Sequence, residues 1–230
     1  MKLGIIGAMD VEVALLKEKM ENSRISSWAG MEFCEGVLEG TPAVVVQCGV
    51  GKINAAMCTQ LLIDRFHVTA VVNTGIAGSL DAQLDIGDLV ISRDAIHHDF
   101  DLRFWGRPVG QVPGMEVTAF PAAESLVQSA YAAAEVVNPG HTRIGRVASG
   151  DQFICSREQK DIIIENTQAI CAEMEGASIA HTAYRNGIPF VILRAISDKA
   201  DDSADIDFHS FEVEAAQRSM EIVKEMIVNL

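Results

Sequence analysis

Short apolar runs alternate with amphipathic stretches along the 230-residue chain. The apolar runs are too short for helices and end at turn-forming residues, so they predict buried strands. The stretches between them carry apolar residues at helical spacing and predict helices. This alternation predicts an α/β fold in which helices flank one central mixed β-sheet.

The expected elements can be placed by residue number. The predicted strands cover residues 2–6, 31–38, 42–48, 69–73, 89–95 and 142–148 and a run that begins at Phe190. The predicted helices cover residues 10–20, 53–65, 123–136 and 156–166, a segment after Gly176 and a final segment after Phe208. Residues 100–121, rich in Gly and Pro, and the acidic residues 199–207 are expected to be irregular. No Pro-, Gly- or Ser-rich linker divides the chain, which predicts a single domain over residues 1–230.

Composition and charge narrow the class of protein. The chain has 18 Lys and Arg residues against 32 Asp and Glu residues, a formal net charge of −14. This balance argues against a nucleic-acid partner, because nucleic-acid affinity rests on clustered cations. The five scattered cysteines form no CxxC pair and predict free thiols in a reducing compartment, and hence a cytoplasmic protein. The apolar N-terminal run fits neither a signal peptide nor a spanning helix, so no membrane partner is expected.

The run that begins at Phe190 delivers three polar residues together at its carboxyl end, namely Arg194, Ser197 and Asp198. Ligands of open α/β folds bind beyond the carboxyl ends of strands. A buried Asp beside a Ser suits proton donation, because burial disfavours the charged carboxylate. The alternative is that Asp198 only caps the next segment as an Asx-turn.

Other predicted strand ends also carry candidate chemistry. Glu12 follows the first strand, where the alternative is an acid favoured by the helix dipole in the first turn. Residues 74–79 form a small-residue turn in which backbone can approach a ligand closely. Residues 149–154 form a further loop on the same side. Glu173 and Glu175 flank Met174 at a helix start, and their spacing points them to different faces.

Three motif-like stretches do not support a function. Gly4 and Gly7 match only part of a dinucleotide-binding fingerprint. Lys52 follows two closely spaced glycines, but Val46 and Ile53 stand where a phosphate-binding P-loop requires Gly and Ser or Thr. Residues 97–99 (His-His-Asp) lack a second cluster of metal ligands, so we expect a polar strand end and no metal.

Five stretches together resemble the nucleoside phosphorylase superfamily, and within it the 5′-methylthioadenosine/S-adenosylhomocysteine nucleosidases. They are Gly4–Glu12 (GIIGAMDVE), Asn73–Gly78 (NTGIAG), Ser149–Ile154 (SGDQFI), Ala172–Glu175 (AEME) and Arg194–Asp198 (RAISD). The resemblance extends over the whole chain, in order and with compatible spacing. It implies a nucleoside phosphorylase-like fold without a cofactor. It also implies hydrolysis of the N-glycosidic bond between adenine and a 5′-thio-substituted ribose.

The resemblance implies catalytic roles for four residues. Asp198, oriented by Ser197, would protonate N7 of adenine, because adenine is a poor leaving group as an anion. Glu12 would hold and deprotonate the attacking water, with Arg194 helping to position it. Two carboxylates in opposite protonation states are a recurring solution in glycoside hydrolysis.

The resemblance also implies how the sugar and its 5′ substituent are held. Glu175 would bind the ribose hydroxyls, Met174 would pack on the sugar, and Glu173 would support this part of the site. An apolar slot for the 5′-alkylthio group would consist of Met9, Val50 and Phe208.

On the adenine side, the resemblance implies stacking on Phe153. The backbone at Ile154 would read the edge of the base, and Ala77 and Gly78 would line the base and the ribose.

Residues 100–121 match a segment that reaches the neighbouring subunit's site in this family, which implies a homodimer. Trp105 and Pro113 occupy the matching positions. Two departures stand out: Trp105 replaces a frequent Phe, and Ile76 replaces a frequent Ser that could assist the water.

Three alternatives stay open. A phosphorylase would use phosphate in place of water, but Glu12 would repel phosphate and Ile76 offers it no donor. A nucleosidase for another adenine nucleoside, such as a futalosine-type substrate, would differ mainly in the apolar slot. A non-catalytic binding protein would be expected to lose Glu12 or Asp198, and both are present.

Overall fold

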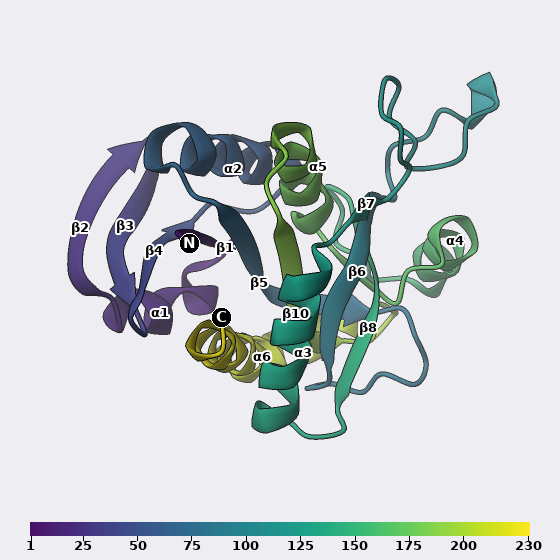
Figure 1. Cartoon of the computed structure of the whole chain (residues 1–230). Coiled ribbons are helices and arrows are strands. Elements are labelled where there is room, and N and C mark those ends of the chain that lie inside the picture. The colour runs from purple at the N-terminus through teal and green to yellow at the C-terminus, as the bar shows by residue number, and fades with distance from the viewer.

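The computed structural model describes residues 1–230, apart from the side chain of Ile206. Its strands form one mixed sheet of ten strands (Figure 1). The strands are β1 (Leu3–Gly7), β2 (Glu21–Trp28), β3 (Met31–Leu38), β4 (Thr41–Gln47), β5 (Ala70–Ser79), β6 (Leu89–His97), β7 (Phe120–Pro121), β8 (Thr142–Ser149), β9 (Cys171–Glu173) and β10 (Phe190–Asp198). The α-helices are α1 (Ala14–Glu18), α2 (Lys52–Phe66), α3 (Glu124–Val137), α4 (Arg157–Thr167), α5 (Gly176–Asn186) and α6 (Ala204–Val228). Two 3₁₀ helices are η1 (Asp10–Glu12) and η2 (Arg103–Trp105).

Strand β5 is the centre of the sheet. It pairs in parallel with β1 and β10 and antiparallel with β9. Because β10 also pairs with β6, β6 with β8 and β8 with β9, these strands and β5 close into a ring. Strands β1, β4, β3 and β2 extend the sheet on the other side of β5. The parallel pairing brings the carboxyl ends of β1, β5 and β10 to one edge.

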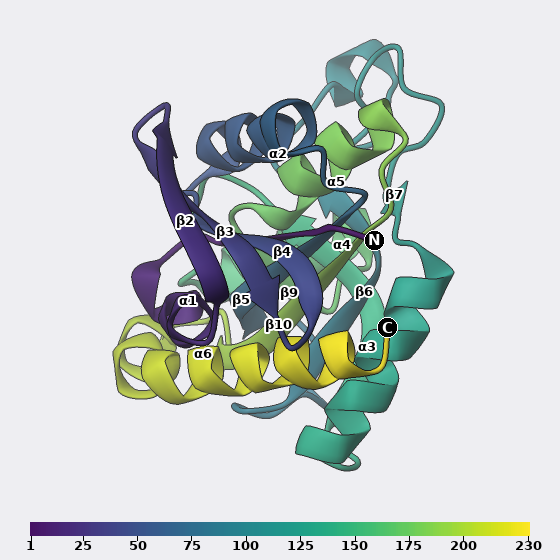
Figure 2. The ribbon, with the colours of Figure 1, turned by 60° about the vertical axis from the view of Figure 1, so that its left-hand side comes forward.

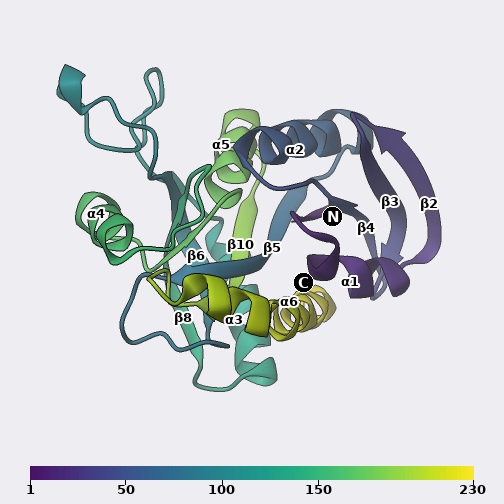
Figure 3. The ribbon, with the colours of Figure 1, turned by 180° about the vertical axis from the view of Figure 1, so that it is seen from behind.

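Helices cover both faces of the sheet (Figures 1 and 2). On one face α1, α3 and α6 pack against apolar residues that include Leu3 and Val72. On the other face α2 and α5 pack against a second core that includes Val44 and Val71. Helix α4 lies apart from these layers (Figure 3) and covers a smaller cluster around Ile163. Within the part of the chain whose side chains are described, no helix is long and apolar enough to cross a membrane.

The predicted α/β fold with a mixed sheet is confirmed, but the predicted turn at residues 74–79 is wrong. Strand β5 continues through this segment to Ser79, and every residue of the strand is buried. Neighbouring strands hold it in place: Gly78 pairs with Asp198 of β10 and with Ala172 of β9. Small residues therefore mark a crowded strand end here, not a chain reversal.

The predicted helix over residues 10–20 is also wrong, because the chain forms η1 and then the short α1. Two backbone N–H groups before η1 donate to the Glu12 side chain, which ties this carboxylate back toward β1. Val13 follows with a φ of −129°, which lies outside the helical region and separates the two helices.

Two further segments differ from expectation. Strand β2 was not predicted, because nearly all of it is exposed and it lacks an apolar alternation. The loop predicted over residues 199–207 is shorter, since α6 already begins at Ala204. Asp205 and Asp207 lie in the first turn of α6, where the helix dipole favours acidic side chains.

Candidate active site

A cavity lies at the edge where β1, β5, β9 and β10 end, and we call it the central cavity. It brings together residues from segments far apart in the sequence. Of the predicted site residues, those that line it are Met9, Glu12, Val50, Ala77, Gly78, Phe153, Glu173, Met174, Glu175, Ser197, Asp198 and Phe208. Ala8, Ile76 and Ala172 complete its wall.

Glu12 is one of four buried acidic residues that line the central cavity. Its Oε2 atom accepts hydrogen bonds from the backbone N–H groups of Ala8 (2.7 Å) and Met9 (3.0 Å). Its Oε1 atom accepts one from the N–H of Ile76 (3.2 Å). Burial raises the pKa of Glu12, while the positive charge of Arg194 and these backbone donors oppose the rise. The three backbone donors thus fix the carboxylate of Glu12 in position, and burial and the charge of Arg194 shift its pKa in opposite directions.

Asp198, another of these four acidic residues, ends β10. Its Oδ2 atom accepts the hydroxyl of Ser197 (2.8 Å), and its Oδ1 atom accepts the N–H of Ala200 (2.8 Å). Burial raises the pKa of Asp198, and these two hydrogen bonds oppose the rise. The negative charges of Asp207 and Asp201 add to it. Asp198 therefore has an environment that favours its protonated form more than an exposed Asp would.

Glu173 and Arg194 form a buried ion pair beside the central cavity. Arg194 Nη2 also donates to Asn73 Oδ1 (2.5 Å). Glu173 further accepts the Ser149 hydroxyl and the backbone N–H groups of Glu175 (3.1 Å) and Gly176. Arg194 itself does not line the cavity. Its guanidinium contacts Glu173 and Asn73, and its positive charge lowers the pKa of Glu12.

Glu175 lies next to this ion pair and faces the cavity. Its Oε1 atom accepts the N–H of Gly51 (2.7 Å), which joins the loop before α2 to the start of α5. Burial, followed by the negative charge of Glu173, raises the pKa of Glu175 to about 8. A carboxyl with this pKa exchanges protons near neutral pH and can both donate and accept hydrogen bonds to a ligand hydroxyl.

Aromatic and aliphatic side chains close the outer end of the cavity. The rings of Phe153 and Phe208 meet edge to face, with centroids 5.6 Å apart and an interplanar angle of 84°. Val50 and Met9 line the same cavity. Ile154 does not line it, because its side chain is buried in the cluster beneath α4.

The segment of residues 100–121 projects away from the sheet and its helices (Figures 1 and 3). Trp105 is 69% exposed and its neighbour Phe104 is 98% exposed. Pro113 is exposed as well, and neither it nor Trp105 lines the central cavity.

Some residues that organise the site were not predicted. Asn73 within β5 and Ser149 at the end of β8 are buried polar residues, and they hold Arg194 and Glu173 respectively. A polar residue that ends an apolar run was the available signal for both. At the predicted polar strand end, Lys52 Nζ donates to both carboxylate oxygens of Asp99 (2.6 and 2.7 Å). Among the described residues, no cluster of three potential metal ligands occurs.

Comparisons with known proteins show the family of the chain. The family model of the phosphorylase superfamily matches residues 2–228. A curated relative from Geobacillus thermodenitrificans, named 5′-methylthioadenosine/S-adenosylhomocysteine nucleosidase, is 42% identical over 99% of this chain and 96% of its own length. The chain therefore belongs to the phosphorylase superfamily.

Within that superfamily, the solved structures define the nearer group. The nucleosidase of the same name from Neisseria meningitidis, in complex with methylthio-immucillin-A, superposes with a TM-score of 0.96 at 38% identity and covers 100% of this chain and 99% of its own. Futalosine hydrolase of Helicobacter pylori superposes with a TM-score of 0.95 at 33% identity, covering 100% and 98%. The chain is thus an enzyme of the nucleosidase group, a hydrolase of N-glycosyl bonds.

Proposed function

We propose that the chain hydrolyses the N-glycosidic bond of 5′-methylthioadenosine and S-adenosylhomocysteine, releasing adenine and the 5′-thioribose product. The observation that carries the proposal is the pair of buried carboxylates, Glu12 and Asp198, in one cavity. The names of the relatives at about 40% identity support this substrate class.

In the proposed reaction, protonated Asp198 transfers its proton to N7 of adenine as the bond between N9 and the anomeric carbon breaks. Ionised Glu12 accepts a proton from water as the water oxygen bonds to that carbon. Neutral adenine leaves, and the two carboxyl groups end with their protonation states exchanged. Burial, with a smaller contribution from the negative charges of Asp207 and Asp201, raises the pKa of Asp198 and favours its protonated form. Burial also raises the pKa of Glu12, and there the positive charge of Arg194 opposes burial and favours the ionised form.

The proposal also assigns the supporting residues. Ser197 orients Asp198 through its hydroxyl. Arg194 fixes Glu173, and through its charge it favours the ionised form of Glu12. Glu175 binds the ribose hydroxyls, with Met174 against the sugar.

For the rest of the substrate, Phe153 stacks on adenine and Ala77 and Gly78 line the base side. The backbone of Ile154 reads the edge of the base. The slot of Met9, Val50 and Phe208 holds the 5′-alkylthio group.

A nucleosidase for futalosine-type substrates is a second candidate, because a futalosine hydrolase is among the similar structures. The three apolar side chains of the slot favour a 5′-thioalkyl group over a larger polar substituent. A phosphorylase is disfavoured because the buried carboxylate of Glu12 would repel phosphate and Ile76 has no hydroxyl to bind it.

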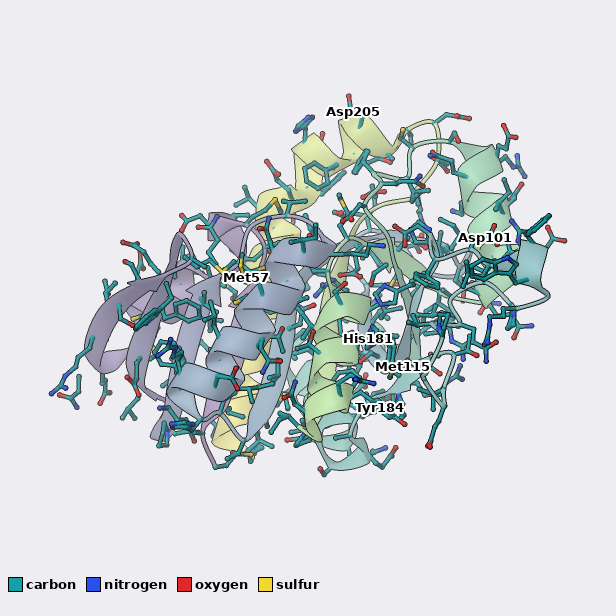
Figure 4. The ribbon with its side chains drawn as sticks, turned by 90° about the horizontal axis from the view of Figure 1, so that it is seen from above. Met57, Asp101, Met115, His181, Tyr184 and Asp205 are labelled. Atoms are coloured by element: carbon teal, nitrogen blue, oxygen red, sulfur yellow. The ribbon has the colours of Figure 1, made fainter. Side chains whose placement is uncertain are left out.

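We further propose a homodimer in which residues 100–121 lie at the interface, with Trp105 and Pro113 against the partner's cavity. Met57 of α2 and His181 and Tyr184 of α5 lie on one face together with Met115 of this segment (Figure 4). His181 stacks on Phe120 at the end of the segment, with ring centroids 4.6 Å apart. The exposed apolar side chains of this face support a protein partner. Five free cysteines support a cytoplasmic location.

The test is adenine release from methylthioadenosine by the purified chain, with and without phosphate, and with identification of the sugar product. The proposal predicts equal rates in both buffers and free methylthioribose as the product. A rate that depends on phosphate, with a sugar 1-phosphate as product, would show a phosphorylase. Release of adenine only from a futalosine-type nucleoside would favour the second candidate.

A further inference from the structure

A second cleft opens beside the central cavity, and we call it the polar cleft. It has a volume of about 550 Å³. Its lining consists of Lys17, Ser27, Gly30, Met31, Glu32, Gln47, Cys48 and Gly49. These residues come from α1, from the hairpin of β2 and β3, and from the carboxyl end of β4.

The polar cleft and the 5′ end of the central cavity share a wall. Gln47 ends β4 and pairs with Gly7 at the end of β1, so both spaces lie at the same edge of the sheet. The N–H of Gly49 donates to the carbonyl of Ala8 (3.1 Å). Ala8 lines the central cavity, and so do Met9 and Val50, which follow these two bonded residues in the chain. Met9 and Val50 of the apolar slot are therefore next in sequence to Ala8 and Gly49, whose bonded backbones separate the slot from the polar cleft.

The charged groups of the polar cleft have opposite signs and are not paired with one another. Among the described residues, neither Lys17 nor Glu32 has an oppositely charged group within 4.0 Å. The side chains of Ser27 and Gln47 likewise form no hydrogen bond within the described part of the chain. Lys17 is half-buried and Glu32 is exposed. A cation, an anion and two neutral polar groups around one cleft are complementary to a small zwitterion.

We propose that the polar cleft binds the amino-acid end of S-adenosylhomocysteine, with Lys17 on its α-carboxylate and Glu32 on its α-ammonium group. The inference rests on the proposed function and deepens it. The thioether of this substrate continues through two methylene groups to a zwitterionic centre, whereas methylthioadenosine ends in a methyl group that stays in the apolar slot. The polar cleft thus allows one active site to accept both the short and the long 5′ substituent.

The test is steady-state kinetics of the full chain with both substrates, on Lys17→Ala and Glu32→Ala. For S-adenosylhomocysteine each variant is expected to raise KM about fivefold and to leave kcat unchanged, because a partly exposed ion pair remote from the breaking bond contributes uniform binding. For methylthioadenosine both parameters are expected to stay within about twofold of wild type, since this substrate has no group that reaches the cleft. Turnover of methylthioadenosine also reports that each variant is folded.

Lys19→Ala and Glu18→Ala are the matched controls, because they make the same charge changes on or beside α1 without lining the cleft. They are expected to behave as wild type with both substrates. The inference is overturned if the Lys17 and Glu32 variants keep the wild-type KM for S-adenosylhomocysteine, or if they change both substrates alike. It is also overturned if the wild-type chain hydrolyses only methylthioadenosine. Failure to release adenine from either substrate contradicts the proposed function itself.

Discussion

Two glycines of β5 make room for the carboxylates of Glu12 and Asp198 in the central cavity. A Cβ atom on Gly75 would lie 2.6 Å from Glu12 Oε1, and one on Gly78 would lie 2.7 Å from Asp198 Oδ1. Neither glycine has a positive φ, so the backbone would accept other residues at both positions. Close approach of the carboxylates is therefore the physical reason for glycine at these two positions.

We predict that Gly75→Ala displaces Glu12 and lowers kcat by about 10²-fold, because small misplacements of reacting groups have costs of this order. Gly78→Ala should do the same through Asp198. Kinetics with methylthioadenosine measure the effect, and circular dichroism checks the fold. Gly4→Ala is the control, because its Cβ would meet the flexible end of Leu62, remote from the site. Unchanged kcat in both β5 variants would contradict this steric account.

The raised pKa of Glu175 predicts a pH dependence of stability. Its pKa is about 8 in the folded chain, against an ordinary value near 4.5. Between these values the folded chain binds the proton more tightly than the unfolded chain, so the free energy of unfolding falls as pH rises from about 4.5 to 8. Glu175→Gln mimics the protonated acid and should flatten this fall.

The measurement is the thermal midpoint of wild type and Glu175→Gln from pH 5.5 to 8.5. The difference between them should grow in favour of the variant as pH rises. Glu18→Gln, at an exposed position of α1, provides the control. Parallel curves for wild type and Glu175→Gln would show that Glu175 does not hold its proton in the folded chain.

At the residue scale, sequence was informative where polar residues follow apolar strands. Glu12 and Asp198 stand at such places, Glu175 stands at a predicted helix start, and the structure brings all three into one cavity. The distant partners that hold site residues were not predictable. The bond between Arg194 and Asn73, for example, joins residues 121 positions apart, and no local pattern records such a contact.

Helix α6 carries Phe208 into the central cavity and is anchored to β5 farther along its length. The Ser219 hydroxyl lies 2.8 Å from Thr74 Oγ1 and accepts the N–H of Gly75 (3.3 Å). Ser219 and Thr74 are fully buried. These bonds connect the last long helix with the strand that positions both carboxylates.

We predict that Ser219→Ala lowers the free energy of unfolding by about 1–3 kcal/mol, because it leaves buried polar groups on β5 without a partner. Chemical denaturation measures the effect. Ser129→Ala is the matched control, because the buried hydroxyl oxygen of Ser129 on α3 has no hydrogen-bond partner among the described residues. That change should be neutral or stabilising. Equal losses in both variants would contradict the anchoring role of Ser219.

At the element scale, strongly patterned segments were predicted well. The predicted helix over residues 123–136 differs from α3 by one residue at each end. Segments whose structure depends on neighbouring strands were not predicted well. Strand β2 is an exposed edge strand with no apolar alternation, and the end of β5 is a strand only because β9 and β10 pair with it. Pairing across the sheet overrode the local preference of small residues for a turn.

At the scale of the whole molecule, the sheet closes through β5 and gathers the site from most of the chain length. The α/β class followed from the alternation of elements, but the closed ring of β5, β10, β6, β8 and β9 did not. Strand order depends on contacts between distant segments. The segment of residues 100–121 projects from this framework and exposes Phe104 and Trp105.

We predict that the chain is a dimer and that Phe104→Asp weakens it, because a carboxylate in an apolar interface loses hydration without gaining a partner. Sedimentation velocity measures the state of wild type and variant. Glu165→Gln, a charge change on the exposed surface of α4, is the control. A wild-type monomer at micromolar concentration would contradict the proposed interface.

The most direct test of the central claim is the rate of adenine release from methylthioadenosine by Glu12→Gln and Asp198→Asn, with substrate affinity measured alongside. If these carboxylates act as general base and general acid, each variant loses about 10²–10⁴-fold in kcat while it still binds the substrate. If either variant binds the substrate and retains kcat within tenfold of wild type, that residue does not carry the proton transfer, and the two-carboxylate account is wrong.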